Sequence, residues 1–214
     1  MKRLYEKIDK SIIPEMPKLV FPGRIFVITT ERDAEEAVNY LLTFPLVGID
    51  TETKPSFHRN VTNKVALLQV STDDTCFLFR LNRLKVSPAV MRFLESDVVK
   101  VGASLNDDIR MMSRRAKFTP GHFIDVQDMI GQLGIQDRAL RKMYANLFGM
   151  NISKHQQLSN WEADILTDAQ MQYAATDAWA CIHIYNEINR LLETHDYELI
   201  PVPIDNEENI SQER

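Results

Sequence analysis

The segment Val47-Gly48-Ile49-Asp50-Thr51-Glu52 begins as a short apolar run and ends with two acidic residues. Such a run predicts a buried β-strand, in which side chains two residues apart point to the same face. Asp50 and Glu52 therefore leave the end of the strand side by side, where their like charges repel. A strand end that frays into an acidic turn would give the same pattern, so the segment alone does not separate a structural role from a functional one.

Other β-rich runs lie on both sides of this strand, with turn residues between them. Two of these runs are separated only by Thr72, Asp73 and Asp74, which predicts a hairpin. The expected strands are residues 25–29, 46–51, 65–71, 75–80 and 98–101.

Helix-start signals follow several of these strands. Thr30 is a suitable cap for one helix, and Ser87-Pro88 supplies a cap and first-turn pair for another. Thr167 and Gln170 form a capping-box pattern ahead of a long helix that we expect to reach about Leu192. Early strands with interleaved and then trailing helices predict an α/β domain, a mixed β-sheet flanked by α-helices.

The chain has 214 residues, of which 44% are apolar, and this suffices for one core without demanding a second domain. Residues 1–23 contain three prolines and little periodicity, so we expect an extended N-terminal arm. Residues 24–195 are expected to form the single folded domain. Residues 196–214 are acidic and poor in apolar side chains, which predicts a flexible tail.

Composition narrows the functional classes. No stretch of about 18 apolar residues is present, so we expect a protein that does not enter a membrane and is cytoplasmic or otherwise intracellular. Cys76 and Cys181 form no CxxC pair and lie in apolar segments, which favours buried free thiols. The net charge of −5 argues against a broad basic face that coats nucleic acid. It does not exclude a nuclease, because a metal site for phosphate concentrates carboxylates.

A third acidic residue lies on the apolar face of a predicted helix. Leu105, Ile109 and Met112 form the apolar stripe of that helix. Asp108 lies on the same inward face, whereas its neighbour Asp107 points about 100° away, toward solvent. Asp108 is therefore the unusual residue of the pair.

Asp177 has the same relation to the long final helix. The buried stripe that follows it consists of Ala180, Cys181, Ile184 and Ile188. Tyr173 lies one turn earlier on the same face, so its hydroxyl and the Asp177 carboxylate can approach a common site. A buried carboxylate costs several kcal/mol unless it is paired or bound to a metal, and a structural Arg or Lys partner is the alternative interpretation.

Four converging carboxylates without Cys or clustered His would make an all-oxygen site, formed by Asp50, Glu52, Asp108 and Asp177. Such hard ligands select Mg²⁺ or Mn²⁺ over zinc. Mutual repulsion would raise their pKa values in the absence of metal. The site suits in-line displacement at phosphorus by two cations roughly 3.5 to 4 Å apart, one activating water and the other stabilising the leaving oxygen.

These segments resemble the three exonuclease motifs of the DEDD superfamily, in its tyrosine-bearing subgroup. The first motif matches Ile49-Asp50-Thr51-Glu52-Thr53, the second Lys100-Val101-Gly102 with Asp108, and the third Tyr173-Ala174-Ala175-Thr176-Asp177. The third is preceded by Leu158-Ser159-Asn160-Trp161. The likeness extends over about residues 24–192 and is closest to the ribonuclease D and Werner-syndrome helicase exonuclease families.

The resemblance implies a ribonuclease H-like fold, with Asp50, Glu52, Asp108 and Asp177 as ligands of two divalent cations and Tyr173 positioning the attacking water. It also implies a metal-dependent 3′-5′ exonuclease that releases nucleoside 5′-monophosphates. The implied substrates are single-stranded 3′ ends of DNA or RNA, and the sequence indicates no protein partner.

Several further residues are candidates for substrate contact. Thr51, Phe57 and Leu67 would suit an apolar wall beside a terminal nucleotide, with core packing as the alternative for Leu67. Lys154 would suit a phosphate contact, with a solvated loop as the alternative. Asp125 is interpreted either as a supporting acid behind the site or as a helix cap.

Two basic clusters would suit contact with a strand backbone, and solvated helix faces are the alternative. The clusters are Arg110, Arg114, Arg115 and Lys117, and Arg138, Arg141 and Lys142.

The main hypothesis is therefore a 3′-5′ exonuclease. A catalytically idle nucleic-acid-binding module of the same fold is the first alternative, and the intact set of carboxylates argues against it. A phosphohydrolase that acts on free nucleotides is the second.

Overall fold

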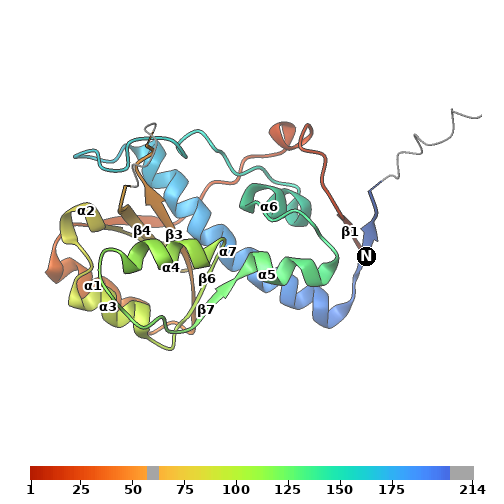
Figure 1. Ribbon diagram of the computed structural model, residues 1–214. Coiled ribbons are helices and arrows are strands. Elements are labelled where there is room, and N and C mark those ends of the chain that lie inside the picture. Colours follow the sequence, from red (N-terminus) through yellow and green to blue (C-terminus); the bar gives the residue numbers. More distant parts are fainter. Residues whose placement is uncertain (57–62, 203–214) are drawn as a thin grey trace, which may run out of the picture.

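A six-stranded mixed sheet forms the centre of the computed structural model, which describes residues 1–56 and 63–202 (Figure 1). In spatial order its strands are β2 (Arg24–Ile28), β5 (Thr75–Arg80), β4 (Val65–Ser71), β3 (Leu46–Thr53), β6 (Val99–Gly102) and β7 (Phe123–Asp125). β4 pairs in antiparallel orientation with both β3 and β5, and the short turn at residues 72–74 predicted its pairing with β5. β2, β6 and β7 join by parallel pairing. The predicted α/β class with a mixed sheet is confirmed.

Helices surround this sheet, and α1, α3 and α7 start where the sequence predicted. They are α1 (Glu31–Leu41), α2 (Leu81–Leu84), α3 (Pro88–Glu95), α4 (Leu105–Ser113), α5 (Val126–Ile130), α6 (Leu140–Phe148) and α7 (Asp168–Thr194), with short 3-10 turns η1 (Ile13–Glu15) and η2 (Gly131–Leu133). The side chains of Thr30 and Ser87 accept hydrogen bonds from the first-turn amides of α1 and α3. Thr167 and Gln170 form the complete capping box of α7. Within residues 1–56 and 63–202, no helix has the length and apolar character needed to span a membrane.

The two faces of the sheet are covered by different helices. On one face, Val47 and Ile49 pack in a hydrophobic cluster with α1 and α3. On the other face lies α7, 27 residues long, which Figure 1 shows crossing behind the sheet. Because side chains alternate along β3, the residues between these apolar ones, including Gly48 and Asp50, are directed toward α7. Both cysteines are buried free thiols, as expected.

The chain ends differ from the expected arm and tail. β1 (Lys2–Tyr5) pairs in parallel with β8 (Tyr197–Ile200), and Figure 1 shows this two-stranded sheet beside the end of α7. Leu4 is fully buried in the cluster that α6 and α7 share, and Leu199 packs against it. Residues 197–200 are therefore an ordered strand rather than part of a flexible tail, because apolar side chains alternate with polar ones there and find a partner at the other end of the chain. Residues 203–214 lie outside the described part.

Gly48 allows α7 to approach β3 closely. A Cβ atom added at Gly48 would lie 1.9 Å from the backbone carbonyl oxygen of Ala178 in α7, a contact that only displacement of the helix could relieve. The absence of a side chain at this position is thus a requirement of the packing between the strand and the helix.

We expect Gly48→Ala to lower the free energy of unfolding by about 1 to 3 kcal/mol or more, because the methyl group overpacks the helix–strand contact. The measurement is urea unfolding followed by circular dichroism. Gly131→Ala is the matched control, since a Cβ there meets its nearest atom, in the Arg138 side chain, at 3.6 Å, an ordinary contact. Equal destabilisation by both substitutions would contradict the close-approach argument.

Candidate active site

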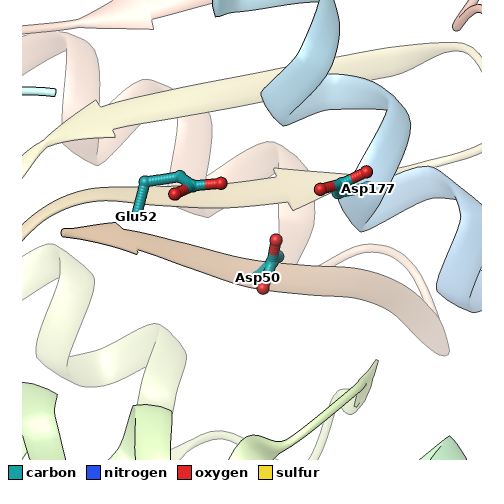
Figure 2. Close-up of side chains that lie close together, drawn as sticks. All are labelled: Asp50, Glu52 and Asp177. Atoms are coloured by element: carbon teal, nitrogen blue, oxygen red, sulfur yellow. The ribbon is translucent and has the colours of Figure 1, made fainter. Parts of the chain in front are cut away.

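Three carboxylates converge between β3 and α7. One oxygen from each of Asp50, Glu52 and Asp177 lies within 4.8 Å of the other two. Figure 2 shows the three side chains gathered around a common space. Asp50 and Glu52 share a face of β3, as their spacing predicted, and Asp177 joins them because its neighbour Ala178 rests on Gly48 of the same strand. The helix-to-strand contact and the carboxylate cluster are thus parts of one arrangement.

Asp108 approaches the same space from α4. Its carboxylate accepts a hydrogen bond of 2.5 Å from the hydroxyl of Thr51, the residue between the two acids of β3. It lies outside the group of three oxygens but lines the same cavity. Its neighbour Asp107 is exposed and forms an ion pair with Arg110 at 2.9 Å, which confirms the predicted difference between the two residues.

Asp125, at the end of β7, holds the helix that carries Asp108. Its carboxylate accepts hydrogen bonds from the amides of Leu105, at 2.8 Å, and Ser104, at 3.3 Å, at the start of α4. It also caps α5 by accepting from the amide of Gln127 at 2.9 Å. The sequence left two interpretations open for Asp125, and the structure shows it capping one helix while it supports another.

The carboxylates line one side of a cavity of about 320 Å³. The other lining residues include apolar ones, but also the polar or cationic Ser153, Arg141, Lys154 and Gln157. A cavity lined by both carboxylates and basic side chains suits a phosphate-containing ligand. Cations held by the carboxylates would bind the phosphate, and its remaining negative oxygens could contact the basic side chains.

Tyr173 also lines the cavity, one helical turn before Asp177. Its ring packs against the fully buried Trp161, with 6.0 Å between ring centroids. Burial, and then the charges of Asp177 and Glu52, raise the pKa of Tyr173 above its ordinary value. The phenol therefore keeps its proton at neutral pH and can act as a hydrogen-bonding group.

The pKa values of all four acids are raised, in each case mainly by desolvation in the cavity. Desolvation raises the pKa of Glu52 to about 9, with further contributions from Asp177 and Asp108. The pKa of Asp50 is raised well above its ordinary value by desolvation and then by the charge of Asp108. Desolvation also raises the pKa of Asp108, and that of Asp177, to about 7, although Thr51 and Tyr173 respectively act in the opposite direction. Without a cation, this cluster would hold protons at neutral pH.

The donor set fits hard divalent cations. The Oδ1 atom of Asp177 is buried and has no hydrogen-bond partner among the residues that the structure describes. An unpartnered buried carboxylate oxygen is unfavourable, and a cation would satisfy it. All the grouped donors are carboxylate oxygens, which Mg²⁺ and Mn²⁺ prefer.

Of the candidate substrate residues, the structure places some at the cavity and others away from it. Thr51 and Lys154 line the cavity. Leu67 does not line it, because its side chain is fully buried in a hydrophobic cluster with Trp161 and other residues, so the core-packing alternative holds for it. Phe57 lies outside the described residues.

Other residues of the cavity carried no sequence signal for a site. Gln127, Ile152 and Gln157 line it, and they come from a short helix and from a loop without periodicity. Arg141 belonged to a predicted basic cluster, but only its tertiary position, half-buried in the cavity wall, separates it from Arg138, which pairs with Asp128.

We expect the metal-free protein to lose stability relative to its Glu52→Gln variant as pH rises from about 5 to 9. The folded-state pKa of Glu52 is above its unfolded value, so its contribution to stability is complete below about 4.5 and is lost as pH approaches about 9. The slope is up to about 1.4 kcal/mol per pH unit for each proton released. Urea unfolding in EDTA measures it, and added Mg²⁺ should abolish the decline for wild type. A pH-independent difference between the two proteins would contradict the assigned repulsion.

Comparison with known proteins agrees with this geometry. The chain is 33% identical over 172 residues to exonuclease 3′-5′ domain-containing protein 2 of Drosophila melanogaster, covering 77% of this chain and 29% of that protein. It is 26% identical over 199 residues to the bifunctional 3′-5′ exonuclease/ATP-dependent helicase of Mus musculus, covering 87% of this chain and 14% of the other. The chain thus spans less than a third of the length of these two relatives.

Solved structures share the fold. The EXO domain of Nibbler from Aedes aegypti superposes with a TM-score of 0.73 at 20% identity, over 86% of this chain and 94% of that one. Escherichia coli RNase D superposes with a TM-score of 0.71 at 20% identity, over 79% of this chain and 45% of that one. The family profile described as 3′-5′ exonuclease matches residues 25–193, a range that includes all four acids and Tyr173. The chain therefore belongs to the 3′-5′ exonuclease family.

Proposed function

We propose that this protein is a metal-dependent 3′-5′ exonuclease that releases nucleoside 5′-monophosphates from single-stranded 3′ ends of DNA or RNA. The observation that carries the proposal is the convergence of Asp50, Glu52 and Asp177, with Asp108 on the same cavity and a buried oxygen of Asp177 left without a protein partner among the described residues. Family membership supports the class of reaction. The names of the relatives include ribonuclease D and DNA polymerase I, which supports a nucleic acid as substrate.

The four carboxylates would hold two divalent cations, and these would supply the activation of water and the neutralisation of charge on the phosphate. Because desolvation, and then repulsion, raise the pKa values of Asp50 and Glu52, bound cations would release their protons and keep the acids charged. Thr51 fixes the Asp108 carboxylate by its hydrogen bond, and Asp125 fixes the helix that carries it.

Tyr173 would position the attacking water through its hydroxyl. Its raised pKa keeps the phenol protonated, so it serves as a donor and acceptor of hydrogen bonds rather than as a base. This role agrees with the tyrosine-bearing subgroup that the motifs resemble. Lys154, on the cationic side of the cavity, would face the phosphate oxygens that the cations leave free.

The test is digestion of 5′-labelled DNA and RNA strands in Mg²⁺ or Mn²⁺ with wild type, Asp50→Ala and Asp177→Ala. We expect wild type to produce a ladder shortened from the 3′ end, and each variant to lose at least about 100-fold in rate, because a cation site is dismantled. Asp107→Ala is the matched control, since this acid lies on the exposed side of α4 and should leave the ladder intact.

The same assay separates the alternatives. Strand binding without cleavage in any metal would overturn the exonuclease and favour the idle binding module. Hydrolysis of free nucleotides with intact strands would favour the nucleotide phosphohydrolase.

We expect Tyr173→Phe to lower kcat by about 10- to 1000-fold with little change in strand affinity, because a positioning group acts on the attacking water. The variant keeps the ring that packs on Trp161, so folding should be preserved. Isothermal titration with Mn²⁺ is the check on the metal site, and it should give wild-type affinity. A kcat equal to that of wild type would remove Tyr173 from the proposed reaction.

A further inference from the structure

A second cavity, of about 350 Å³, adjoins the first and is cationic. Four of its lining residues carry basic side chains, Lys18, Arg141, Lys154 and His155, and none of its lining residues is acidic. We call it the basic hollow. In a chain with a net charge of −5, such a concentration of one sign requires an explanation.

The basic hollow is continuous with the candidate active site. Arg141, Ser153 and Lys154 line both cavities. A third cavity, of about 200 Å³, shares Lys18 and His155 with the basic hollow and shares Tyr173 and Asp177 with the active site. A ligand that leaves the carboxylates toward Lys154 would therefore enter the basic hollow without crossing the protein.

The basic hollow is built by segments that are distant in sequence. A backbone bridge joins Lys18 to Asn151, with the Leu19 amide donating to the Asn151 carbonyl and the Asn151 amide donating to the Pro17 carbonyl, each at 2.9 Å. The buried Asn151 side chain accepts a hydrogen bond of 2.7 Å from Nε of Arg141. These bonds fix the Lys18 backbone and the Arg141 guanidinium in one wall, and they leave the other guanidinium donors of Arg141 available.

The basic side chains of the hollow are not neutralised by ion pairs. Among residues 1–56 and 63–202, none of the four basic side chains forms an ion pair with a carboxylate, whereas Arg110, Arg138, Lys142 and Arg190 each do. Arg141 thus differs from its sequence neighbour Lys142 in its charge partner. Lys142 forms an ion pair with Asp137 at 2.6 Å, whereas Arg141 lines the cavity without an ion pair among the described residues. Basic side chains held together without ion-paired carboxylates are suited to bind an anion from outside the chain.

We propose that the basic hollow binds the sugar-phosphate backbone of the substrate strand, upstream of the phosphate that is cleaved. The inference rests on the proposed exonuclease function, because it places the 3′-terminal nucleotide at the carboxylates. The strand then leaves the active site past Lys154 and Arg141 and runs over Lys18 and His155 toward its 5′ side. These contacts are to phosphates, so they select for strand length rather than for base identity.

The test compares a strand with a substrate too short to reach the basic hollow. The long substrates are DNA and RNA strands of about 12 nucleotides, a length typical of extended single-strand sites. The short substrate is the p-nitrophenyl ester of thymidine 5′-monophosphate, which offers a phosphodiester to the carboxylates and no upstream phosphate. The proteins are wild type, Lys18→Gln, Lys18→Arg and the matched control Lys85→Gln, an exposed lysine that lines none of the three cavities.

For Lys18→Gln, we expect the ratio of kcat/KM on strands to kcat/KM on the ester to fall about tenfold, through a higher KM on strands. The salt dependence of strand binding should weaken by about 0.7 in log–log slope for each phosphate that the variant no longer neutralises. Lys18→Arg should restore the ratio, and Lys85→Gln should leave it unchanged. A smaller loss on DNA than on RNA, or the reverse, would identify which backbone fits the basic hollow.

Other outcomes would overturn the proposal. An unchanged ratio in Lys18→Gln, or an equal fall in Lys85→Gln, would show that the basic hollow does not hold the strand. If wild type cleaved neither substrate, the exonuclease function itself would fail. Fluorescence anisotropy of a labelled strand in Ca²⁺ would then test the basic hollow independently: weaker binding by Lys18→Gln would support it, and equal binding would overturn it.

Discussion

The contact between α7 and β3 at Gly48 is the constraint on which the site depends. A side chain at this position would collide with the backbone of Ala178, so the helix lies against the strand only because the residue is glycine. That contact places Asp177 opposite Asp50 and Glu52, which no property of α7 alone would do. Close packing of a helix on a strand therefore positions the carboxylates, and the cavity opens where the packing ends.

The carboxylate cluster lowers the stability of the metal-free fold. Desolvation raises the pKa values of all four acids, and like charges add to this for Asp50, Glu52 and Asp108, so the metal-free cluster retains protons that acids in water would lose. The surrounding structure holds them in place through hydrogen bonds, with the Thr51 hydroxyl on Asp108 and the Asp125 carboxylate on the amides of α4. In the proposed function, ligands would supply the charge compensation, divalent cations at the carboxylates and phosphates at the basic residues.

Sequence reasoning predicted the elements whose signals are local. Alternation in β3 placed Asp50 and Glu52 on one face, and helical spacing separated Asp108 from the exposed Asp107. Caps at Thr30, Ser87 and Thr167 located three helices. Sequence reasoning was wrong where local composition and tertiary packing disagree: residues 197–200 form a strand because β1 pairs with them. For Leu67, of the two interpretations that the sequence left open, packing in the core is the one that holds.

The sequence by itself determined the class of fold, the acids and tyrosine that could act together, and the family whose motifs they resemble, because strand and helix periodicity assign each side chain to a face. Only the tertiary structure decided which faces meet. Asn151, in a loop without periodicity, joins the Lys18 segment to Arg141 of α6, and the two basic residues lie 123 positions apart in the sequence. Such long-range contacts arise from backbone pairing and packing between elements, and no periodic pattern within either segment encodes them.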